Sequence, residues 1–286
     1  MQTKKRIVYC AVLITISIGI LSINNHSNAT LAMPHKTSIA HTPYAYIFDM
    51  GGVLIDTSTR KTAYHLGLNT LFSYWMTTRK PMSELLLSFY ETLHKINGSR
   101  NNIHNVRDPK GNVLPQLMCD WLSGTRSSHE IRSTINHAIT LHPEWFENKT
   151  EETIIHRIAT TIFTPRFFAA VCEIIYDGFA LVRECKMRNN QVYILSNWDP
   201  ESFFLITQKF GITTDIFDGI AISGATGLLK PSIDAYQQLM HRYQLDPSQC
   251  VVIDDQQENI EAAQQCGMHA IRCYRTQGWF SSYPDL

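Results

Sequence analysis

The sequence predicts an α/β fold, a doubly wound parallel sheet with an inserted α-helical cap domain. Two observations carry this prediction. In the carboxyl-terminal half, short apolar runs alternate with stretches of helical period, which is typical of right-handed crossovers and of a parallel sheet covered on both faces. Between residues 57 and 163 the helical period continues without a strand pattern of useful length. A chain of 286 residues is long enough for one large domain that carries an insert.

Residues 1–29 differ in composition from everything that follows. A basic start, Lys4–Arg6, precedes an uncharged run at residues 7–23, and Ser27–Ala29 has the small residues of a signal-peptidase site. We therefore expect a signal peptide, cleavage after Ala29, and export to the periplasm or the medium. The apolar run is close to the length of a membrane span, so an uncleaved membrane anchor is the alternative.

Charge and cysteine content argue against several kinds of partner. Lys plus Arg and Asp plus Glu both number 25, so the net charge is zero and no basic surplus attracts nucleic acid or anionic lipid. We therefore expect no nucleic-acid partner, and no membrane partner once the signal peptide is removed. Of the 7 cysteines, all but Cys10 follow residue 29, and they are scattered. This spacing predicts neither a zinc site nor a disulfide.

The core begins within residues 30–56. The apolar run 46–48 ends at a single carboxylate, Asp49, and Gly51 and Gly52 follow it. This order predicts a buried strand that presents Asp49 into a crevice, because ligands of parallel sheets bind outside the carboxyl ends of the strands. Asp49 is thus a candidate nucleophile. An acidic residue at such a place is more often a turn former or a helix cap. The hypothesis that Asp49 is a nucleophile is therefore supported only by the later segments.

Residues 57–163 are predicted to form the helical cap. Apolar residues between 85 and 93 share one helical face, and residues 96–112 have the polar, glycine-containing composition of a loop. A further helix begins at Pro115 and is closed by Gly124, and the helical period returns from Ile131 to Ile139.

Residues 164–286 return to the core. Thr164 is a predicted helix cap with Pro165 at the first helical position, and the apolar face that follows continues to Val182, which predicts one unbroken helix. Short strands and helices then alternate. Strands are predicted at 192–195, 219–223, 250–253 and 269–274, and helices at 201–210, 232–243 and 258–266.

Polar side chains end three of the predicted strands. Asp49, Ser196 and the pair Asp254–Asp255 all lie at carboxyl ends, which open onto one crevice in a parallel sheet. Carboxylates this close repel one another unless they share a hard cation such as Mg²⁺. The alternative is that one of the pair caps the helix that begins near Glu258. The hydroxyl of Ser196 is suited to donate to a phosphoryl oxygen.

A functional role for two further residues is inferred only because these acids are predicted to lie beside them. Lys230 precedes Pro231 in a glycine-containing loop, so its backbone is held and its ammonium can be directed at phosphate and at Asp49. Asn197 follows Ser196 at the end of its strand. A lone lysine in a loop is usually solvated, and a Ser-Asn pair is usually no more than a turn.

The order and separation of these segments resemble the four motifs of the haloacid dehalogenase superfamily of hydrolases, over roughly residues 44–275. The resemblance implies a Rossmann-like core, a C1-type cap and an Mg²⁺ cofactor. It implies catalytic roles for Asp49, Ser196 and Lys230, substrate binding by Asn197 and Gly52, and metal binding by Asp49, the carbonyl of Gly51, Asp254 and Asp255.

The residues around the motifs are most similar to those of bacterial sugar-phosphate phosphatases of the glucose-1-phosphatase kind. This likeness rests on Phe48–Val53, Leu114–Pro115 and Asp120–Trp121. The implied function is Mg²⁺-dependent hydrolysis of a small phosphorylated molecule by an exported enzyme.

One position departs from the pattern of the superfamily. Most of its phosphatases carry a second aspartate two residues after the nucleophile to protonate the leaving group, and here Gly51 occupies that place. Asp56, Asp120 and His137 are candidate substitutes, although each is more often a loop or surface residue. Two other functions stay open, a hydrolytic dehalogenase that needs no metal and a binding protein that keeps the fold without activity.

Overall fold

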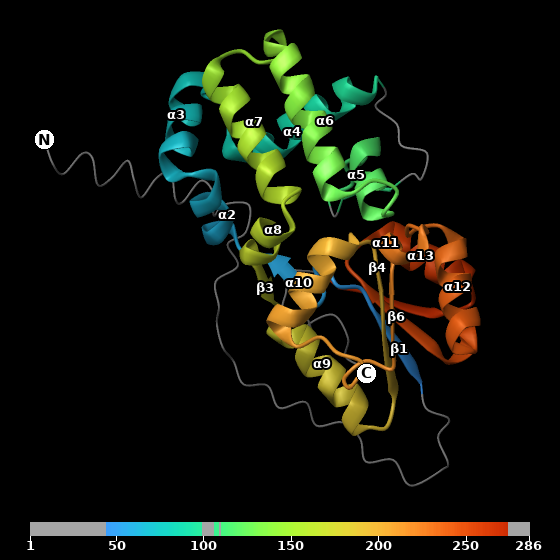
Figure 1. Ribbon diagram of the computed structural model, residues 1–286. Helices are drawn as coiled ribbons and strands as arrows, with labels where there is room; N and C mark the ends of the chain where they lie inside the picture. The colour runs from blue at the N-terminus through green and yellow to red at the C-terminus, as the bar shows by residue number, and fades with distance from the viewer. Residues whose placement is uncertain (1–43, 99–105, 109, 274–286) are drawn as a thin grey trace, which may run out of the picture.

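Five parallel strands form the centre of the molecule (Figure 1). The computed structural model describes residues 44–98, 106–108 and 110–273. The strands are β1 (Ala45–Phe48), β4 (Gln191–Ser196), β5 (Gly219–Ile222), β6 (Cys250–Asp254) and β7 (His269–Arg272), in the order β5-β4-β1-β6-β7. Every pairing is parallel, and each strand lies where the sequence predicts one. The predicted doubly wound sheet is therefore confirmed.

Helices cover both faces of this sheet. They are α9 (Tyr176–Met187), α10 (Pro200–Phe210), α12 (Ile233–Tyr243) and α13 (Gln257–Gln265), with the short helices α11 (Ser223–Thr226) and η3 (Pro247–Gln249) between them. Phe48 packs with residues of α9 and α10, whereas its neighbour Ile47 packs on the opposite face with residues of α12 and α13. Successive side chains of a strand point to opposite faces, so an apolar strand buried on both sides explains this split.

The inserted segment is helical and lies beyond the carboxyl ends of the strands (Figure 1). It contains α2 (Thr59–Leu66), α3 (Leu68–Thr78), η1 (Met82–Glu84), α4 (Leu85–Asn97), α5 (Gln116–Leu122), α6 (Ser128–Leu141), η2 (Pro143–Trp145) and α7 (Lys149–Ile162). Local signals begin two of these helices: Ser127 and Glu130 form a capping box for α6, and Asn148 caps α7.

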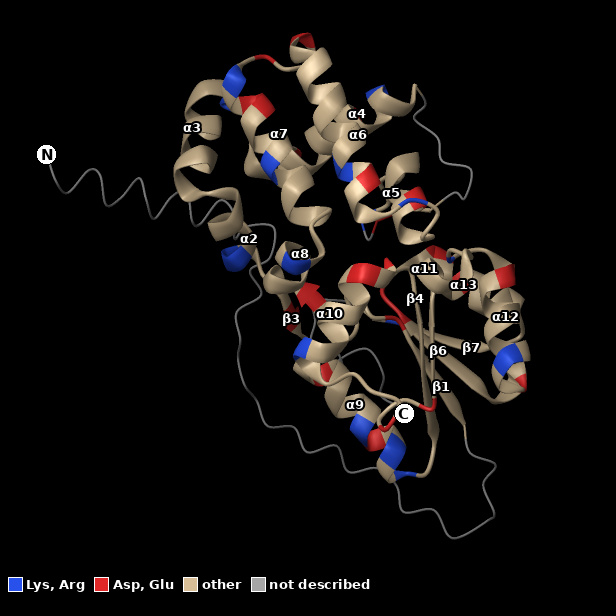
Figure 2. Ribbon diagram, in the orientation of Figure 1, with Lys and Arg blue, Asp and Glu red and all other residues tan. Residues whose placement is uncertain are grey.

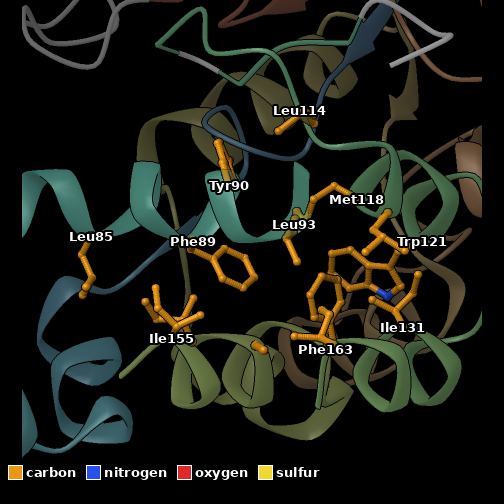
Figure 3. Close-up of a cluster of buried hydrophobic side chains, with 14 of the residues drawn as sticks. Leu85, Phe89, Tyr90, Leu93, Leu114, Met118, Trp121, Ile131, Ile155 and Phe163 are labelled. Atoms are coloured by element: carbon orange, nitrogen blue, oxygen red, sulfur yellow. The ribbon is translucent and has the colours of Figure 1, made fainter. Parts of the chain in front are cut away.

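A separate hydrophobic cluster holds the inserted helices together. Figure 3 shows that Phe89 of α4, Trp121 of α5 and Ile155 of α7 converge with Phe163, the residue that directly follows α7. The rings of Trp121 and Phe163 meet edge to face with centroids 5.0 Å apart, an arrangement that aromatic pairs favour. The insert therefore has a core of its own, distinct from the two clusters on the sheet.

The prediction of one unbroken helix after Thr164 is wrong. The chain forms α8 (Pro165–Val171), then a short strand β3 (Cys172–Ile174), and only then α9. The strand pairs antiparallel with β2 (Ile55–Thr57), which the sequence analysis also missed. Backbone bonds extend the ribbon at both ends, from Ser58 N to Val171 O at 2.8 Å and from Ile175 N to Leu54 O at 2.8 Å. This pairing joins segments far apart in the sequence, and it overrides a continuous helical period.

Some predictions fall outside the described residues. The predicted signal peptide, residues 1–29, and the lead-in as far as residue 43 belong to this group. Within the described ranges, no helix combines the length and the apolar character that crossing a membrane requires. The cysteines of these ranges form no disulfide with one another.

Candidate active site

The predicted site residues meet at the carboxyl edge of the sheet. Phe48 pairs with Ile194 of β4 and with Ile253 of β6, so Asp49 emerges between the ends of these two strands. The backbone of Asp49 continues the ladder by one bond, from its N–H to the carbonyl of Ile253 at 2.9 Å. Because β1 is the central strand, Asp49 stands in the middle of the edge.

A tight turn follows Asp49 and aims its carboxylate. The carbonyl of Met50 accepts from Leu54 N at 2.9 Å and from Ile55 N at 2.8 Å, and Met50 N donates to Asp49 Oδ1 at 2.7 Å. Gly52 has φ 75°, a left-handed conformation that favours glycine. Its N–H donates to Ile55 O at 2.9 Å, so the amide of Gly52 is used inside the turn. This geometry argues against the predicted binding of substrate by Gly52, and it assigns the glycine to the backbone of the turn.

Lys230 is buried between two carboxylates. Its Nζ lies 3.0 Å from Asp49 Oδ1 and 2.6 Å from Asp254 Oδ2. Burial disfavours the charged ammonium, but the charges of Asp254 and Asp49 together raise the pKa of Lys230 above its usual value. Lys230 is therefore a cation held against the candidate nucleophile, not the solvated lysine that a loop position usually gives.

Asn197 holds the backbone of Lys230 in place. Its Nδ2 donates to the carbonyl of Lys230 at 2.8 Å, and its Oδ1 accepts from the N–H of Lys230 at 2.8 Å. Both ends of the side-chain amide are thus bonded to one residue. A side-chain contact between Asn197 and substrate is disfavoured by this geometry. The clamp on Lys230 could not be predicted from local sequence, because it joins two loops that lie far apart in the chain.

The acid pair is fixed by the start of α13. Asp254 accepts from Gln256 N at 2.9 Å, and the Nδ2 of Asn259 lies 2.9 and 3.1 Å from its two carboxylate oxygens. The hydroxyl of Tyr236 donates to Asn259 O at 2.9 Å. Asp254 therefore orders the turn before the helix while it faces Lys230. The alternative that one of the two acids caps this helix is not supported, because its N-cap is Gln256 and no side chain caps it.

Three acids and one lysine leave this site short of positive charge. Asp49, Asp254 and Asp255 are all buried, and each offers a carboxylate oxygen within 4.8 Å of those of the other two. Burial raises the pKa of Asp49 above its usual value, and the charge of Lys230 opposes that rise without overcoming it. Hard oxygen ligands gathered in this way fit a divalent cation such as Mg²⁺. Gly51, the fourth predicted ligand, contributes a carbonyl that accepts no hydrogen bond from the described residues.

The N–H groups around Asp49 suit a phosphoryl group. The amides of Gly51 and Asn197 donate to no acceptor among the described residues. The hydroxyl of Ser196 is buried and hydrogen-bonds to the carboxyl of Asp49, which favours its ionised form. Donors of this kind next to a carboxylate can hold the oxygens of a tetrahedral group under attack.

Trp198 lies beside position 51, the place of the missing acid. A Cβ built on Gly51 would meet Trp198 Cζ3 at 3.8 Å, an ordinary contact, and Gly51 does not have the left-handed φ that excludes other residues. The backbone therefore does not forbid an aspartate at position 51. Trp198 is fixed by bonds from its Nε1 to Ser202 Oγ at 2.9 Å and from its N–H to Ser223 Oγ at 3.0 Å. No local pattern in the sequence predicts a role for Trp198.

The three substitutes proposed for the acid differ in their surroundings. Asp56 lies in β2 and accepts from Thr57 N at 2.7 Å. Asp120 accepts from the side chain of Gln116 at 2.7 Å, and His137 is exposed on α6. In the described part of the chain, neither Asp120 nor His137 hydrogen-bonds to the residues around Asp49. The structure thus offers no clear replacement for the aspartate.

The cap and the site loops touch through Ser223. Its hydroxyl donates to the carbonyl of Leu122, at the end of α5, at 2.6 Å and accepts from the N–H of Trp198. Close by, a Cβ on Gly124 would come within 2.3 Å of the carbonyl oxygen of Gly224. The backbones of cap and core therefore approach at a point where a larger residue does not fit.

Comparison with known proteins agrees with this geometry. The family of haloacid dehalogenase-like hydrolases matches residues 45–267. A sesquiterpene phosphatase of Aspergillus oryzae is 30% identical over 89 residues, which are 31% of this chain and 45% of that protein. The chloroplastic protein SUPPRESSOR OF QUENCHING 1 of Arabidopsis thaliana is 31% identical over 91 residues, 32% of this chain and 9% of that protein. The match thus spans less than half the length of either curated relative.

Solved structures share the fold. A haloacid dehalogenase-family enzyme of Bacteroides thetaiotaomicron superposes with a TM-score of 0.55 at 16% identity, covering 85% of this chain and 99% of that one. Its complex with magnesium and inorganic phosphate gives a TM-score of 0.51 at 14% identity, covering 84% and 99%.

Proposed function

Because the chain belongs to the haloacid dehalogenase-like hydrolases, we propose that it is an exported, Mg²⁺-dependent phosphatase that hydrolyses small phosphomonoesters through an aspartyl-phosphate on Asp49. One observation carries the proposal. The carboxylate of Asp49 lies 3.0 Å from the ammonium of Lys230, inside a buried cluster of three carboxylates at the edge of a parallel sheet. A solved relative of the same fold was crystallised with magnesium and inorganic phosphate, the cofactor and the product of such a reaction.

The reaction proceeds in two displacements at phosphorus. A carboxylate oxygen of Asp49 attacks phosphorus, the bond to the leaving oxygen breaks, and its electron pair departs with that oxygen. A water oxygen then attacks phosphorus, the bond to Asp49 breaks, and inorganic phosphate leaves as one water proton passes to solvent. Ser196 Oγ and the amides of Gly51 and Asn197 hold the phosphoryl oxygens, and Lys230 offsets their charge.

Mg²⁺ neutralises charge on the phosphoryl group and on the acids that hold it. Asp49, the carbonyl of Gly51, Asp254 and Asp255 would hold the ion. Hydrolysis of p-nitrophenyl phosphate should therefore require Mg²⁺ and stop with a chelator. Asp255→Ala should lower the activity steeply, with partial recovery in excess Mg²⁺, because one ligand of a hard cation is lost. Activity of the wild-type enzyme that persists in the chelator would refute the metal role.

The substrate is selected by the helical segment 57–163, which we assign as a C1-type cap. Sugar phosphates are the first class to test, because the sequence around the motifs resembles that of glucose-1-phosphatase-like enzymes. Phosphorylated isoprenoids are the second, because a sesquiterpene phosphatase is among the relatives. A screen that also includes nucleotides and phosphoamino acids, run beside Asp49→Asn, ranks these classes by kcat/KM.

Two rival functions make different predictions in the same assays. A metal-free dehalogenase gains nothing from two further carboxylates beside Asp49, and it would release halide from 2-haloacids in the presence of chelator. A binding protein without activity, which Gly51 makes conceivable, would be stabilised by Mg²⁺ and phosphate but would turn over no ester.

Export is tested on the amino terminus of the mature protein. Sequencing of periplasmic or secreted material should begin near Thr30, since Ser27–Ala29 ends the predicted signal. Recovery of the full-length chain in the membrane fraction alone would replace cleavage by anchoring.

A further inference from the structure

An apolar stripe is exposed along α2 and α3, far from the chemistry of Asp49. The side chains of Tyr64, Leu68, Phe72 and Met76 are 77%, 50%, 36% and 42% exposed. They follow one another at intervals of four residues, which places Leu68, Phe72 and Met76 on one side of α3. Tyr64 belongs to α2, before the break at Gly67, and the other three form a row on α3. Exposed apolar side chains are normal when scattered, but a row on one side of a helix marks an interaction surface.

The opposite sides of these helices are occupied. Leu71 and Tyr74 of α3 are buried with Ala63 and Leu66 of α2 in the cluster of the cap, and both helices pack on α7. The stripe therefore faces outward because the inward positions already fill the core of the cap. Figure 1 shows α2 and α3 at one margin of the molecule, where neither helix is covered by another labelled helix on its outer side.

Charge is segregated on the same helices. From residue 57 to residue 83 the sequence contains no Asp or Glu, although the chain as a whole is neutral. Figure 2 shows α2 and α3 without acidic segments. The four cations of this stretch are Arg60, Lys61, Arg79 and Lys80. The neutrality that argued against an anionic surface as partner thus hides a local excess of positive charge.

The four cations differ in their ion pairs with the described residues. Lys61 lies 2.8 Å from Glu173, and Lys80 contacts Glu147 and Glu151. Arg60 and Arg79, by contrast, form no ion pair with any described residue, and both are exposed. The guanidinium of Arg79 lies 5.4 Å from the ring centre of Trp75, which places it beside the stripe.

A hollow of about 310 Å³ opens next to the stripe, between α2 and α8. It is lined by Arg60, Lys61, Tyr64, His65 and Ala170. Arg166 of α8 is exposed nearby, with its guanidinium 4.8 Å from the ring centre of Phe167, which in turn contacts His65. The accessible lining of this hollow is almost wholly apolar, so the hollow extends the apolar surface and has Arg60 among its lining residues.

We propose that this α2–α3 face docks on a bilayer that contains anionic lipid. The apolar side chains enter the boundary between headgroups and acyl chains while Arg60 and Arg79 contact lipid phosphates, the arrangement of an interfacial amphipathic helix. A second copy of the chain fits the face poorly, because a two-fold contact sets the same patch against itself and brings like charges together. This surface departs from the expectation that the mature protein has no membrane partner, and it does not depend on the proposed phosphatase activity.

The test is flotation of the full chain with preformed vesicles, of phosphatidylcholine alone or with phosphatidylserine. Binding should require phosphatidylserine and weaken in high salt. Each cation near an anionic surface contributes about fivefold to partitioning, so the loss of two cations lowers it on the order of 30-fold. Arg60→Glu with Arg79→Glu also adds two anions and should lower partitioning by at least that factor. Hydrogen exchange should show protection of peptides from residues 59–79 on addition of vesicles.

Matched variants separate this face from the rest of the chain. Leu68→Ser with Phe72→Ser should also weaken binding, whereas Tyr176→Ser and Arg242→Glu, exposed residues of the core, should leave it unchanged. Any contribution of the apolar run 7–23 is the same in every variant. Unchanged hydrolysis of p-nitrophenyl phosphate, or unchanged circular dichroism if the enzyme is inactive, shows that each variant is folded.

Three results would overturn the proposal. Equal binding by the wild type and the Arg60→Glu, Arg79→Glu variant would place the membrane contact elsewhere. Equal binding to vesicles with and without phosphatidylserine would remove the role of charge. A dimer in light scattering that Leu68→Ser with Phe72→Ser dissociates, without vesicle binding, would assign the face to a second copy.

Discussion

The strand-end cluster of the core and the interior of the cap are both buried, but opposite kinds of side chain fill them. In the core, Lys230 lies between the carboxylates of Asp49 and Asp254. In the cap, Trp121 and Phe163 pack edge to face, and the indole N–H makes one polar contact, to Ser128 Oγ at 3.0 Å. Burying charge costs free energy even when it is paired, whereas burying aromatic rings stabilises the fold. The core therefore retains its costly cluster for chemistry, and the cap supplies stability and shape.

The largest effect should come from the candidate nucleophile. Asp49→Asn removes the attacking oxygen anion but keeps the shape of the side chain, so kcat for p-nitrophenyl phosphate should fall on the order of 10⁴-fold or more. Circular dichroism and the melting temperature should show an intact fold. Activity near that of the wild type would contradict the contrast between core and cap, because the buried charges of the core would then have no role in catalysis.

Gly51→Asp tests the effect of the general acid that is missing two residues after Asp49. Without an acid at position 51, kcat/KM should fall steeply as the leaving alcohol becomes more basic. Aryl phosphates and sugar 1-phosphates should therefore have a higher kcat/KM than sugar 6-phosphates. The gap should be on the order of 10²–10⁴-fold, the usual contribution of general acid catalysis. Gly51→Asp should narrow it, because a Cβ at this position meets only Trp198 at 3.8 Å. A flat wild-type series would mean that another residue supplies the proton, and Asp56 would be the next variant.

For the cap, Phe163→Ala should act on stability. Phe163 is 0% exposed and contacts both Trp121 and Phe89, so its removal should lower the free energy of unfolding by about 3–5 kcal/mol. Phe72→Ala, on the exposed side of the same cap, is the matched control and should cost less than about 1 kcal/mol. Chemical denaturation measures both. Loss of p-nitrophenyl phosphate hydrolysis by folded Phe163→Ala would show that the cap also shapes the chemical step.

The smallest effect concerns a buried carboxyl outside the cluster. Asp199 caps α10, accepting from Ser202 N at 2.9 Å, and burial raises its pKa to about 6. A carboxyl whose pKa is higher in the folded state binds its proton more tightly there. Its contribution to stability is full below its unfolded pKa, near 3.8, and is lost as the pH rises through about 6. Relative to Asp199→Asn, the wild type should gain stability between pH 7 and pH 4, by roughly 3 kcal/mol at most. Parallel curves of stability against pH for the two proteins would contradict this.

The sequence by itself determined the five strands of the parallel sheet, the helical character of the insert and the group of residues at the site. Hydrophobic period is a local property, so the runs that end at Asp49, Ser196 and Asp254 could be assigned without knowledge of their neighbours. Parallel strands place their carboxyl ends at one edge, and the convergence of these residues followed from that rule alone.

Only the tertiary structure decided which groups contact one another. The break at Cys172–Ile174 depends on pairing with β2, a segment far away in the chain, and a helical period continues through it. The clamp of Asn197 on Lys230, and the place of Trp198 beside Gly51, likewise join residues from separate loops. Overall composition does not show that residues 57–83 lack acidic side chains, although the sequence itself does. That the apolar row of α3 faces outward depends on the packing of α2 and α3 on α7. Contacts and surfaces arise from packing between distant segments, and a local pattern carries no record of them.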